Sequence, residues 1–226
     1  MLRIAEVFDS IQGEGRFTGV PTSFVRTTGC NLRCSFCDTP YTSWQPEGIQ
    51  RTWESVLDEI LSYPSEHVVV TGGEPMLQPD VVPLTYALRD AGKQLTIETA
   101  GTVFRRVHAD LMSISPKLSN STPADSVWRP RHERLRDNRA VVTRLIAEYP
   151  YQLKFVIDRV DDIAEVEAYL TGFDGVAAEH VWLMPQARCR EELEEKTAWL
   201  REEASRCGYQ FSPRLHIELF GNVRGK

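Results

Sequence analysis

The sequence has no uninterrupted apolar run that approaches the length needed to cross a bilayer, so we expect no transmembrane helix and no membrane partner. Its start, Met1-Leu2-Arg3-Ile4-Ala5-Glu6, also lacks the apolar stretch of a secretory signal peptide. We therefore expect a cytoplasmic protein. In that compartment clustered cysteines serve as ligands more often than as disulfides.

An excess of positive charge is missing as well. The chain carries 26 Lys and Arg against 32 Asp and Glu, a net charge of −6. Nucleic-acid binding is driven by phosphate neutralisation, so we expect no direct nucleic-acid partner and only an indirect role in RNA modification. There is no internal repeat and no low-complexity segment. What remains, 226 residues with 42% hydrophobic and 26% charged residues, is typical of a globular protein, and we expect residues 1–226 to form a single domain.

Cysteine is scarce, yet three of the five cysteines fall within eight residues, where Cys30, Cys34 and Cys37 form a C-x3-C-x2-C pattern. Closed structural zinc sites need four protein ligands, whereas an iron–sulfur cluster held by three thiolates leaves one iron open for chemistry. The alternative is three buried cysteines on one helix face, because the spacing is i, i+4, i+7. The glycine and asparagine beside Cys30, and the Asp-Thr-Pro that follows Cys37, argue against a helix.

Short β-branched runs alternate with amphipathic stretches along most of the chain. The runs predict strands over Thr22–Thr27, His67–Thr71, Gln94–Glu98, Leu111–Ser115, Tyr151–Ile157, Val181–Met184 and Leu215–Leu219. Such alternation predicts an α/β fold in which helices lie outside a mostly parallel sheet, as in a complete or a partial (β/α) barrel.

The helices between these strands have recognisable ends. One can begin at Pro79 and stop at Gly92, and another ends at Gly208. Asp162 and Glu165 form a possible capping box for a third. Of the two remaining cysteines, Cys207 is expected to be a packing residue, and Cys189 has no identifiable partner.

The segment from Leu118 to about Asp137 is polar, interrupted by proline and then basic. We expect a polar surface excursion at about residues 118–149 that runs into a helix. Its arginines form a solvated face or, as an alternative, a docking site for an acidic electron carrier.

A second motif, Gly72-Gly73-Glu74-Pro75, follows the apolar run Val68–Val70. Two glycines let a backbone approach a ligand closely, although a Gly-Gly pair alone is usually a plain strand-ending turn. Parallel sheets bind ligands at the carboxyl ends of their strands. The cysteine triplet and this turn both follow predicted strands, and so do Glu98–Gly101, Ser115–Lys117 and Met184–Gln186. This shared placement predicts a ligand site at that edge of the sheet.

The cysteine triplet after one strand and the Gly-Gly-Glu turn after the next together resemble the radical S-adenosylmethionine superfamily. The resemblance implies a partial (β/α) barrel of the radical SAM type and a 4Fe-4S cluster held by Cys30, Cys34 and Cys37. S-adenosylmethionine would chelate the open iron, and an electron donor such as flavodoxin or ferredoxin would drive its cleavage to a 5′-deoxyadenosyl radical. The protein's part would be to position the reactants and exclude water.

Further motifs resemble one family of that superfamily, the 7-carboxy-7-deazaguanine synthases. They are Ser10–Gly15, Pro21–Arg26, Cys37-Asp38-Thr39 and the terminal Arg214-Leu215-His216 with Gly221–Gly225. The resemblance implies the radical ring contraction of a pterin, 6-carboxy-5,6,7,8-tetrahydropterin, to 7-carboxy-7-deazaguanine with loss of ammonia, in 7-deazapurine (queuosine) biosynthesis. It also implies a homodimer.

The same resemblance implies which residues contact each ligand. Thr39 would bind a magnesium ion that bridges to the substrate carboxylate, in keeping with the oxygen ligands that this cation prefers. The substrate contacts would be Ile11, Gln12, Gly13, Glu14, Arg26, Thr71, His216 and the carboxylate of Lys226. The S-adenosylmethionine contacts would be Phe36, Asp38, Gly73, Glu98, Ser115, Lys117, Met184, Pro185 and Gln186. No side chain is assigned as catalytic, because the cofactor supplies the radical.

Several of these residue types suit their implied roles. Gln12 and Glu14 can pair with the aminopyrimidinone edge of a pterin, which offers donors and acceptors side by side. Arg26 can hold a carboxylate with two hydrogen bonds, or else form a structural salt bridge at a strand end. His216 can contact substrate, although a histidine in a strand is more often a satisfied core residue. Lys226 departs from the apolar or proline end residue of the family.

Two other functions are compatible with parts of the sequence. An activase that generates a glycyl radical on a partner protein would share the cysteine triplet and the Gly-Gly-Glu turn. A non-catalytic metal-binding module would share the triplet alone and leave the turn unexplained.

Overall fold

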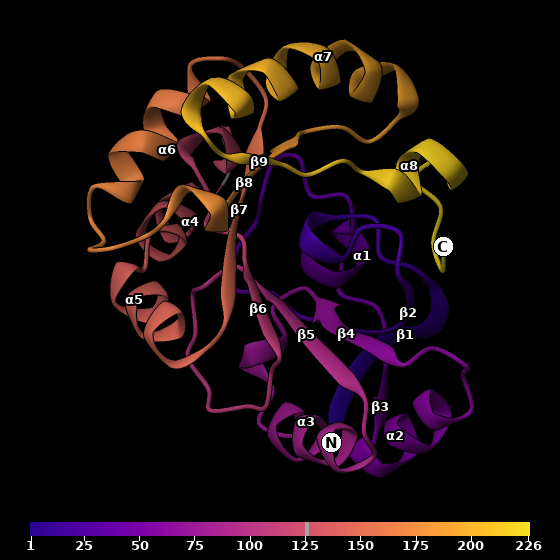
Figure 1. The fold of residues 1–226 in the computed structure, drawn as a ribbon. Helices are drawn as coiled ribbons and strands as arrows, with labels where there is room; N and C mark the ends of the chain where they lie inside the picture. Colours follow the sequence, from indigo (N-terminus) through magenta and orange to yellow (C-terminus); the bar gives the residue numbers. More distant parts are fainter. Residues whose placement is uncertain (125–126) are drawn as a thin grey trace.

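The computed structural model describes residues 1–124 and 127–226, and within them nine strands form one open sheet in the order β3-β1-β2-β4-β5-β6-β7-β8-β9 (Figure 1). The strands are β1 (Leu2–Ile11), β2 (Pro21–Thr27), β3 (Ile49–Arg51), β4 (His67–Gly72), β5 (Gln94–Thr99), β6 (Leu111–Ile114), β7 (Tyr151–Ile157), β8 (Val181–Pro185) and β9 (Gln210–Phe211). β1 pairs antiparallel with β2 and β3, and every other neighbouring pair is parallel.

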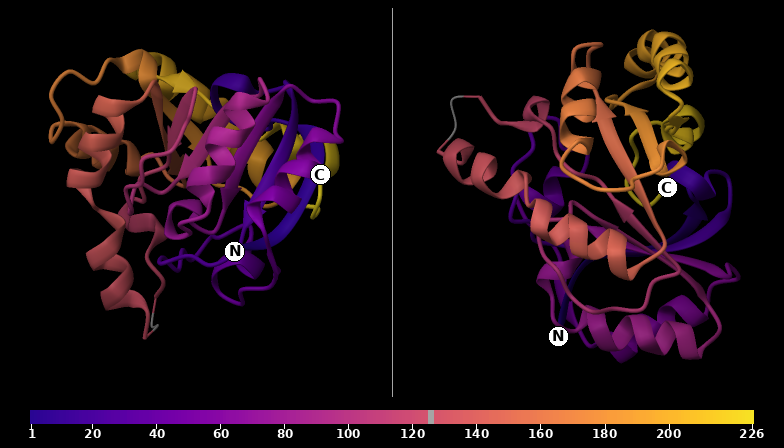
Figure 2. Two further views of the ribbon diagram at one scale, coloured as in Figure 1. Left: turned by 90° about the horizontal axis from the view of Figure 1, so that it is seen from below. Right: turned by 60° about the vertical axis from the view of Figure 1, so that its left-hand side comes forward.

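Most of the helices lie outside the curved sheet, whereas the short helix Pro40–Ser43 lies within its curve (Figures 1 and 2). The helices are α1 (Pro40–Ser43), α2 (Trp53–Leu61), α3 (Val81–Asp90), α4 (Arg129–Arg136), α5 (Arg139–Glu148), α6 (Asp162–Leu170), α7 (Arg190–Cys207) and α8 (Leu215–Phe220). The sheet does not close, so the predicted partial (β/α) barrel is confirmed. Among the described residues, no helix is both long and apolar enough to cross a membrane.

Six of the seven predicted strands are confirmed, and the seventh is wrong. Leu215–Leu219 lies in helix α8, which buries Ile217. A short apolar run can serve either as a strand or as a helix face, and here β9, a few residues earlier, occupies the sheet edge. His216 therefore lies on a helix and not in a strand. The sequence reasoning also missed β1, whose pairing with β2 shifts register between Ile4 and Glu6 and so breaks a regular alternation.

The predicted helix ends are mostly correct. Gly92 and Gly208 end α3 and α7 with φ of 77° and 71°, a backbone conformation that favours glycine. The capping box at α6 is wrong, because the Asp162 carboxylate accepts the backbone N–H groups of Asp158 and Arg159 in the turn before the helix. Glu165 instead accepts the backbone N–H of Ser119, 2.8 Å away, so it ties the helix to a distant segment.

The central strands are buried on both faces, as a parallel sheet with covering helices requires. Val68, Val69 and Val70 of β4 are fully buried, and so are Leu153, Phe155 and Ile157 of β7. Because these strands run in the same direction, their carboxyl ends meet at one edge of the sheet, and the loops that follow them share one region of space.

The two ends of the chain meet beside that region. After β1, the Gly13 carbonyl accepts the backbone N–H of Leu215 at 2.9 Å, and the Gly15 N–H donates to Ser212 Oγ at 2.8 Å. A Cβ at Gly13 would lie only 2.1 Å from Nδ1 of His216, so this approach requires glycine. These contacts link the loop after β1 to the segment after β9.

Candidate active site

A cavity of about 520 Å³ lies at the carboxyl ends of the strands. Every site residue predicted from the sequence lines it except Pro185, which is buried in β8. The lining residues that were predicted are Ile11, Gln12, Gly13, Glu14, Arg26, Cys30, Cys34, Phe36, Cys37, Asp38, Thr39, Thr71, Gly73, Glu98, Ser115, Lys117, Met184, Gln186, His216 and Lys226.

The three clustered cysteines all face this cavity, whereas Cys189 and Cys207 are not among its lining residues. Burial raises the pKa of Cys30 and of Cys34 to about 12, and the nearby Glu74 carboxylate adds to the effect at Cys30. Metal binding to these thiols must therefore displace their protons. In the described part of the chain no three His, Cys, Asp or Glu side chains converge as around a single metal ion. A cluster places each thiolate on a different iron, so three thiols spread around one cavity fit it.

The Gly72-Gly73 turn contacts the backbone of the cysteine loop. The Gly73 N–H donates to the Thr27 carbonyl at 3.1 Å, and the Glu74 N–H donates to the Gly29 carbonyl at 2.9 Å. A Cβ at Gly73 would lie 2.3 Å from the Gly29 oxygen. The glycines thus let this turn pack directly against the chain just before Cys30, while Gly73 still borders the cavity.

Glu74 is a buried structural residue. Its carboxylate accepts the Thr99 hydroxyl at 2.8 Å, the Ala100 N–H at 2.9 Å and the Met76 N–H at 3.1 Å. Burial raises the pKa of Glu74 in spite of these donors. The side chain joins the end of β4 to the end of β5 and so fixes two loops that border the cavity.

The segment after β6 holds the other side of the cysteine loop. The buried His132, on α4, accepts the Arg33 N–H through Nδ1 at 3.1 Å and contacts Ser121 Oγ through Nε2 at 3.0 Å. The Ser121 carbonyl accepts the Ser35 N–H at 2.9 Å. Burial lowers the pKa of His132 to about 4, which keeps its ring neutral and able to accept at Nδ1. The part of the chain expected as a polar excursion therefore contributes a buried clamp on the loop.

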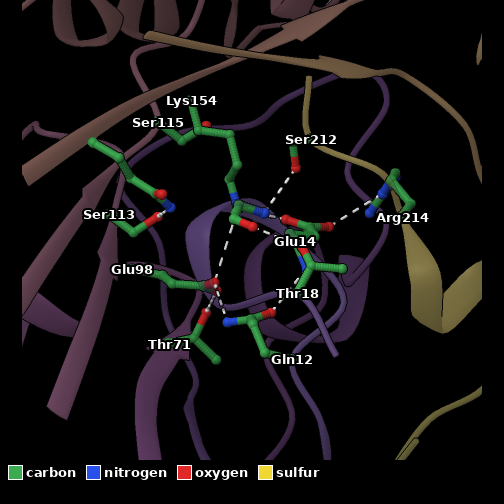
Figure 3. A network of polar contacts seen from close by, with 12 residues as sticks. Gln12, Glu14, Thr18, Thr71, Glu98, Ser113, Ser115, Lys154, Ser212 and Arg214 are labelled. Carbon is green, nitrogen blue, oxygen red and sulfur yellow. Dashed lines mark hydrogen bonds and ion pairs between the residues drawn. The ribbon is translucent and has the colours of Figure 1, made fainter. Parts of the chain in front are cut away.

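The cavity is also lined by a group of buried and partly buried charges that we call the charged corner, formed by Glu14, Glu98, Lys154 and Arg214 (Figure 3). Lys154 Nζ lies 2.5 Å from Glu14 Oε2 and 3.8 Å from Glu98 Oε1. Arg214 Nε lies 3.1 Å from Glu14 Oε1, and the same guanidinium pairs with Asp38. Both cationic side chains are only 5% exposed, so solvent screens these pairs weakly.

These pairs fix the charge states of their members. Burial raises the pKa of Glu14, but Lys154 and Arg214 outweigh that effect and hold it well below its usual range. Burial lowers the pKa of Lys154, yet Glu14 and Glu98 raise it overall. Glu14 is consequently a carboxylate and Lys154 an ammonium, so one offers only hydrogen-bond acceptors and the other only donors.

Two polar residues extend this corner along the cavity wall. Gln12 donates through Nε2 to Glu98 Oε1 at 3.3 Å and accepts the Glu14 N–H through Oε1 at 3.1 Å. Thr71 Oγ1 donates to Glu98 Oε2 at 2.8 Å (Figure 3). The predicted substrate residues Gln12, Glu14 and Thr71 are thus brought into one network with Glu98.

Arg26 occupies a different part of the wall. Its Nε lies 2.7 Å from Glu6 Oε1, which also accepts the Tyr41 hydroxyl at 2.6 Å. Arg224 lies 3.6 Å from the other oxygen of Glu6 and donates to the Ala5 carbonyl at 3.2 Å. Arg26 therefore does form a structural salt bridge, and it also borders the cavity.

Residues on two further loops are positioned by lysines. Lys117 Nζ donates to Ser115 Oγ at 2.6 Å. Lys196 Nζ donates to both the backbone and the side-chain oxygen of Gln186, at 2.8 and 2.9 Å. The Thr39 hydroxyl borders the cavity next to Cys37, with Oγ1 3.9 Å from its Sγ.

Sequence reasoning missed Lys154 as a site residue and quoted Arg214 only as part of a motif. Lys154 left a signal, because it stands in the middle of the apolar strand Tyr151–Ile157, and lysine is almost never fully buried unless it is paired. Its partner Glu14 lies 140 positions earlier, so no local pattern could have joined the two.

The sequence and the fold are similar to those of known proteins. The Radical SAM superfamily matches residues 24–140. A 7-carboxy-7-deazaguanine synthase of Rhodopirellula baltica is 43% identical over 229 residues, which cover 99% of this chain and 88% of that protein. One from Halobacterium salinarum is 41% identical, with 98% and 91% covered. Among solved structures, QueE from Escherichia coli superposes with a TM-score of 0.71 at 28% identity, covering 95% of this chain and 94% of that one.

Proposed function

The chain belongs to the radical SAM superfamily and, within it, to the 7-carboxy-7-deazaguanine synthases, and we propose that it converts 6-carboxy-5,6,7,8-tetrahydropterin to 7-carboxy-7-deazaguanine with loss of ammonia. Full-length similarity to curated synthases supports this activity over the activase and the metal-binding module. The reaction belongs to 7-deazapurine (queuosine) biosynthesis.

One observation carries the proposal. A single cavity brings three thiols of the cysteine loop together with the charged corner, whose members are spread over the chain from Glu14 to Arg214. A module that only binds metal needs the thiols and has no use for paired carboxylates and cations in the same cavity. An enzyme that holds a polar heterocycle against its cofactor needs both.

Different residues bind the cluster and S-adenosylmethionine. Cys30, Cys34 and Cys37 hold the 4Fe-4S cluster; with S-adenosylmethionine bound to it, the cluster supplies the radical chemistry. S-adenosylmethionine binds to the part of the cavity wall formed by Gly73, Glu98, Ser115, Lys117, Met184 and Gln186. Phe36 and Asp38, which flank Cys37, belong to the same set, and Pro185 supports it from within β8. Their task is to orient the nucleoside and to exclude water from the reacting atoms.

The substrate lies between the cysteine loop and the charged corner. The aminopyrimidinone ring of the substrate binds to the side chains of Gln12, Glu14 and Thr71. The backbone of Ile11 and Gly13 and the ring of His216 lie beside it. Arg26 faces the substrate carboxylate, and Lys226, which also borders the cavity, adds a contact. Thr39 binds a magnesium ion whose other ligands come from substrate and water, as is usual for this cation.

Three further features belong to the same proposal. A low-potential protein such as flavodoxin or ferredoxin supplies the electron. The enzyme acts as a homodimer, and residues 1–226 act as a single domain.

Anaerobic turnover tests the proposal. Reconstituted protein with a low-potential reductant and S-adenosylmethionine is expected to convert the carboxytetrahydropterin to 7-carboxy-7-deazaguanine with loss of ammonia, which mass spectrometry detects. Addition of magnesium is expected to increase the rate. Cleavage of S-adenosylmethionine without this product would contradict the proposal and favour an activase.

A further inference from the structure

Lys154 has a hydrogen-bonding capacity that the protein does not use. An ammonium group carries three N–H donors. Among the described residues only Glu14 accepts a hydrogen bond from Lys154, because Glu98 Oε1, at 3.8 Å, is beyond hydrogen-bond distance. The side chain is 5% exposed and borders the cavity. Buried donors without partners are costly, so a ligand that offers an acceptor at this point gains binding energy.

The neighbour of Lys154 has the opposite character. Glu14 is held as a carboxylate between Lys154 and Arg214, and it also borders the cavity. A carboxylate has more lone pairs than these two contacts use, so it can accept further hydrogen bonds. One wall of the cavity thus presents an acceptor and a donor side by side (Figure 3).

A 2-amino-4-oxo pyrimidine ring has the complementary pattern. Along one edge it carries the oxo group, which accepts, next to the ring N–H and the amino group, which donate. We propose that Lys154 is a specificity-determining residue that donates to the 4-oxo group of the substrate while Glu14 accepts from the neighbouring N–H and amino groups. This assignment rests on the proposed function, which supplies the pterin.

The assignment differs from a purely structural role for Lys154. If the ammonium only balanced the charges of Glu14 and Glu98, its loss would weaken all pterins alike. A donor to the oxo group instead rejects any analogue with an amino group at that position, because two donors then face each other. Sites built to hydrogen-bond one substrate group discriminate strongly against analogues that lack it.

Two stable pteridines separate these roles. 6-Carboxypterin keeps the 4-oxo group and the neighbouring ring N–H, whereas 2,4-diaminopteridine-6-carboxylate has an amino group at position 4 and no N–H on that ring nitrogen. The lost N–H faces Glu14 in every Lys154 variant, so comparing variants isolates the group at position 4. Both pteridines fluoresce, so their dissociation constants can be measured by titration of the protein without turnover. We expect the ratio of the diamino to the oxo dissociation constant to fall about 10- to 100-fold in Lys154→Met relative to the original protein, the loss of a hydrogen bond to a charged group. In Lys154→Arg, which keeps a cationic donor, it should stay within about threefold.

The matched control is Lys93→Met. Lys93 lies just before β5, does not border the cavity, and donates to the Ser65 carbonyl at 2.7 Å. Its ratio should not change. Thermal unfolding checks that each variant folds. If Lys154→Met does not fold, Lys154→Gln replaces it and is expected to give an intermediate ratio, because an amide is a weaker donor.

An unchanged ratio in Lys154→Met, or in Lys154→Gln where that variant stands in, overturns the inference and leaves Lys154 a charge-balancing residue. Turnover by the unmodified protein, measured in parallel, separates this failure from that of the proposed function. If the unmodified protein turns over but the ratio of dissociation constants does not depend on Lys154, the inference fails and the proposed function stands. A Lys154-dependent ratio without turnover defeats the proposed reaction but not the pterin recognition, and failure to bind either pterin defeats both.

Discussion

The two sides of the cavity are held together by different forces. On one side the cysteine loop is fixed by backbone and neutral contacts, among them Gly73 against Gly29 and the neutral ring of His132 on the Arg33 N–H. We call this side the cysteine corner. On the other side the charged corner relies on ion pairs between buried side chains. Backbone contacts place a loop whatever ligand arrives, whereas buried charges already define which ligand atoms are favoured.

The comparison predicts that loss of a cysteine abolishes activity without unfolding the protein. Cys34→Ala removes one of three cluster ligands, and the loop keeps its backbone contacts. We expect no detectable product and a lower iron content, with little change in thermal unfolding. Product mass, iron analysis and calorimetry measure these outcomes.

Cys207→Ala is the control, because Cys207 packs at the edge of the core and does not border the cavity. It should keep its iron and its activity. A Cys34→Ala protein that still made product would contradict the cluster assignment.

In the charged corner the largest effect should be on stability. Arg214→Met leaves Glu14 and Asp38 without their shared cation, and breaking a buried pair costs about 3–5 kcal/mol of unfolding free energy. The folded-state pKa of Glu14 lies below its ordinary value of 4.5, so its contribution is present above that pH and is lost as the pH falls. The variant should lose much of this contribution, which urea unfolding at several pH values can measure.

Arg206→Met serves as the control, since Arg206 pairs with Glu203 on the exposed surface of α7 and such pairs contribute little. If both arginine variants unfolded at the same urea concentration, the charged corner would not be a stabilising element.

The tight approach of Gly73 to Gly29 predicts a smaller loss of stability. Gly73→Ala places a Cβ 2.3 Å from the Gly29 oxygen, and overpacking of this kind costs about 1–3 kcal/mol. Because the displaced atoms precede Cys30, iron content should fall as well. Gly172→Ala is the control, since its Cβ would meet only the flexible end of Arg139. Equal losses in both would mean that the turn does not hold the cysteine loop.

His132 predicts a pH dependence of the cysteine corner. Its folded-state pKa of about 4 lies below the ordinary value of 6.5, so the neutral ring stabilises the fold fully above pH 6.5. As the pH falls from 6.5 toward 4 that contribution declines. Urea unfolding should show this slope in the unmodified protein and a flatter one in His132→Asn. Identical slopes would show that another group titrates in this range.

The same division explains what the sequence could predict. In the cysteine corner, the cysteines and the Gly-Gly-Glu turn form contiguous motifs, residues 30–37 and 72–75, at or soon after the ends of strands, so these residues and their place at the sheet edge were predictable. In the charged corner, Glu14 and Glu98 were predicted by resemblance, but their partner Lys154 was not. Pairing across 140 residues depends on the tertiary fold, and a lone lysine in an apolar strand does not name its partner.

Local ambiguity accounts for the remaining differences. Leu215–Leu219 suits either a strand or a short helix, and only the presence of β9 at the sheet edge decides between them. The polar composition of residues 118–137 predicted exposure, yet His132 within it is buried against the cysteine loop. Overall composition describes a segment's average, and one buried side chain can determine its role.

The hydrogen bond between Arg214 and Glu14 joins residues 200 positions apart, and this has a consequence for how the molecule is made. At about 5–20 residues per second, a ribosome adds Arg214 roughly 10–40 s after Glu14. Most strands and the cysteine loop can assemble during that interval, but Glu14 cannot pair with Arg214 until Arg214 has been synthesised. Synthesis of the segment that carries Arg214 is therefore required before the charged corner can form.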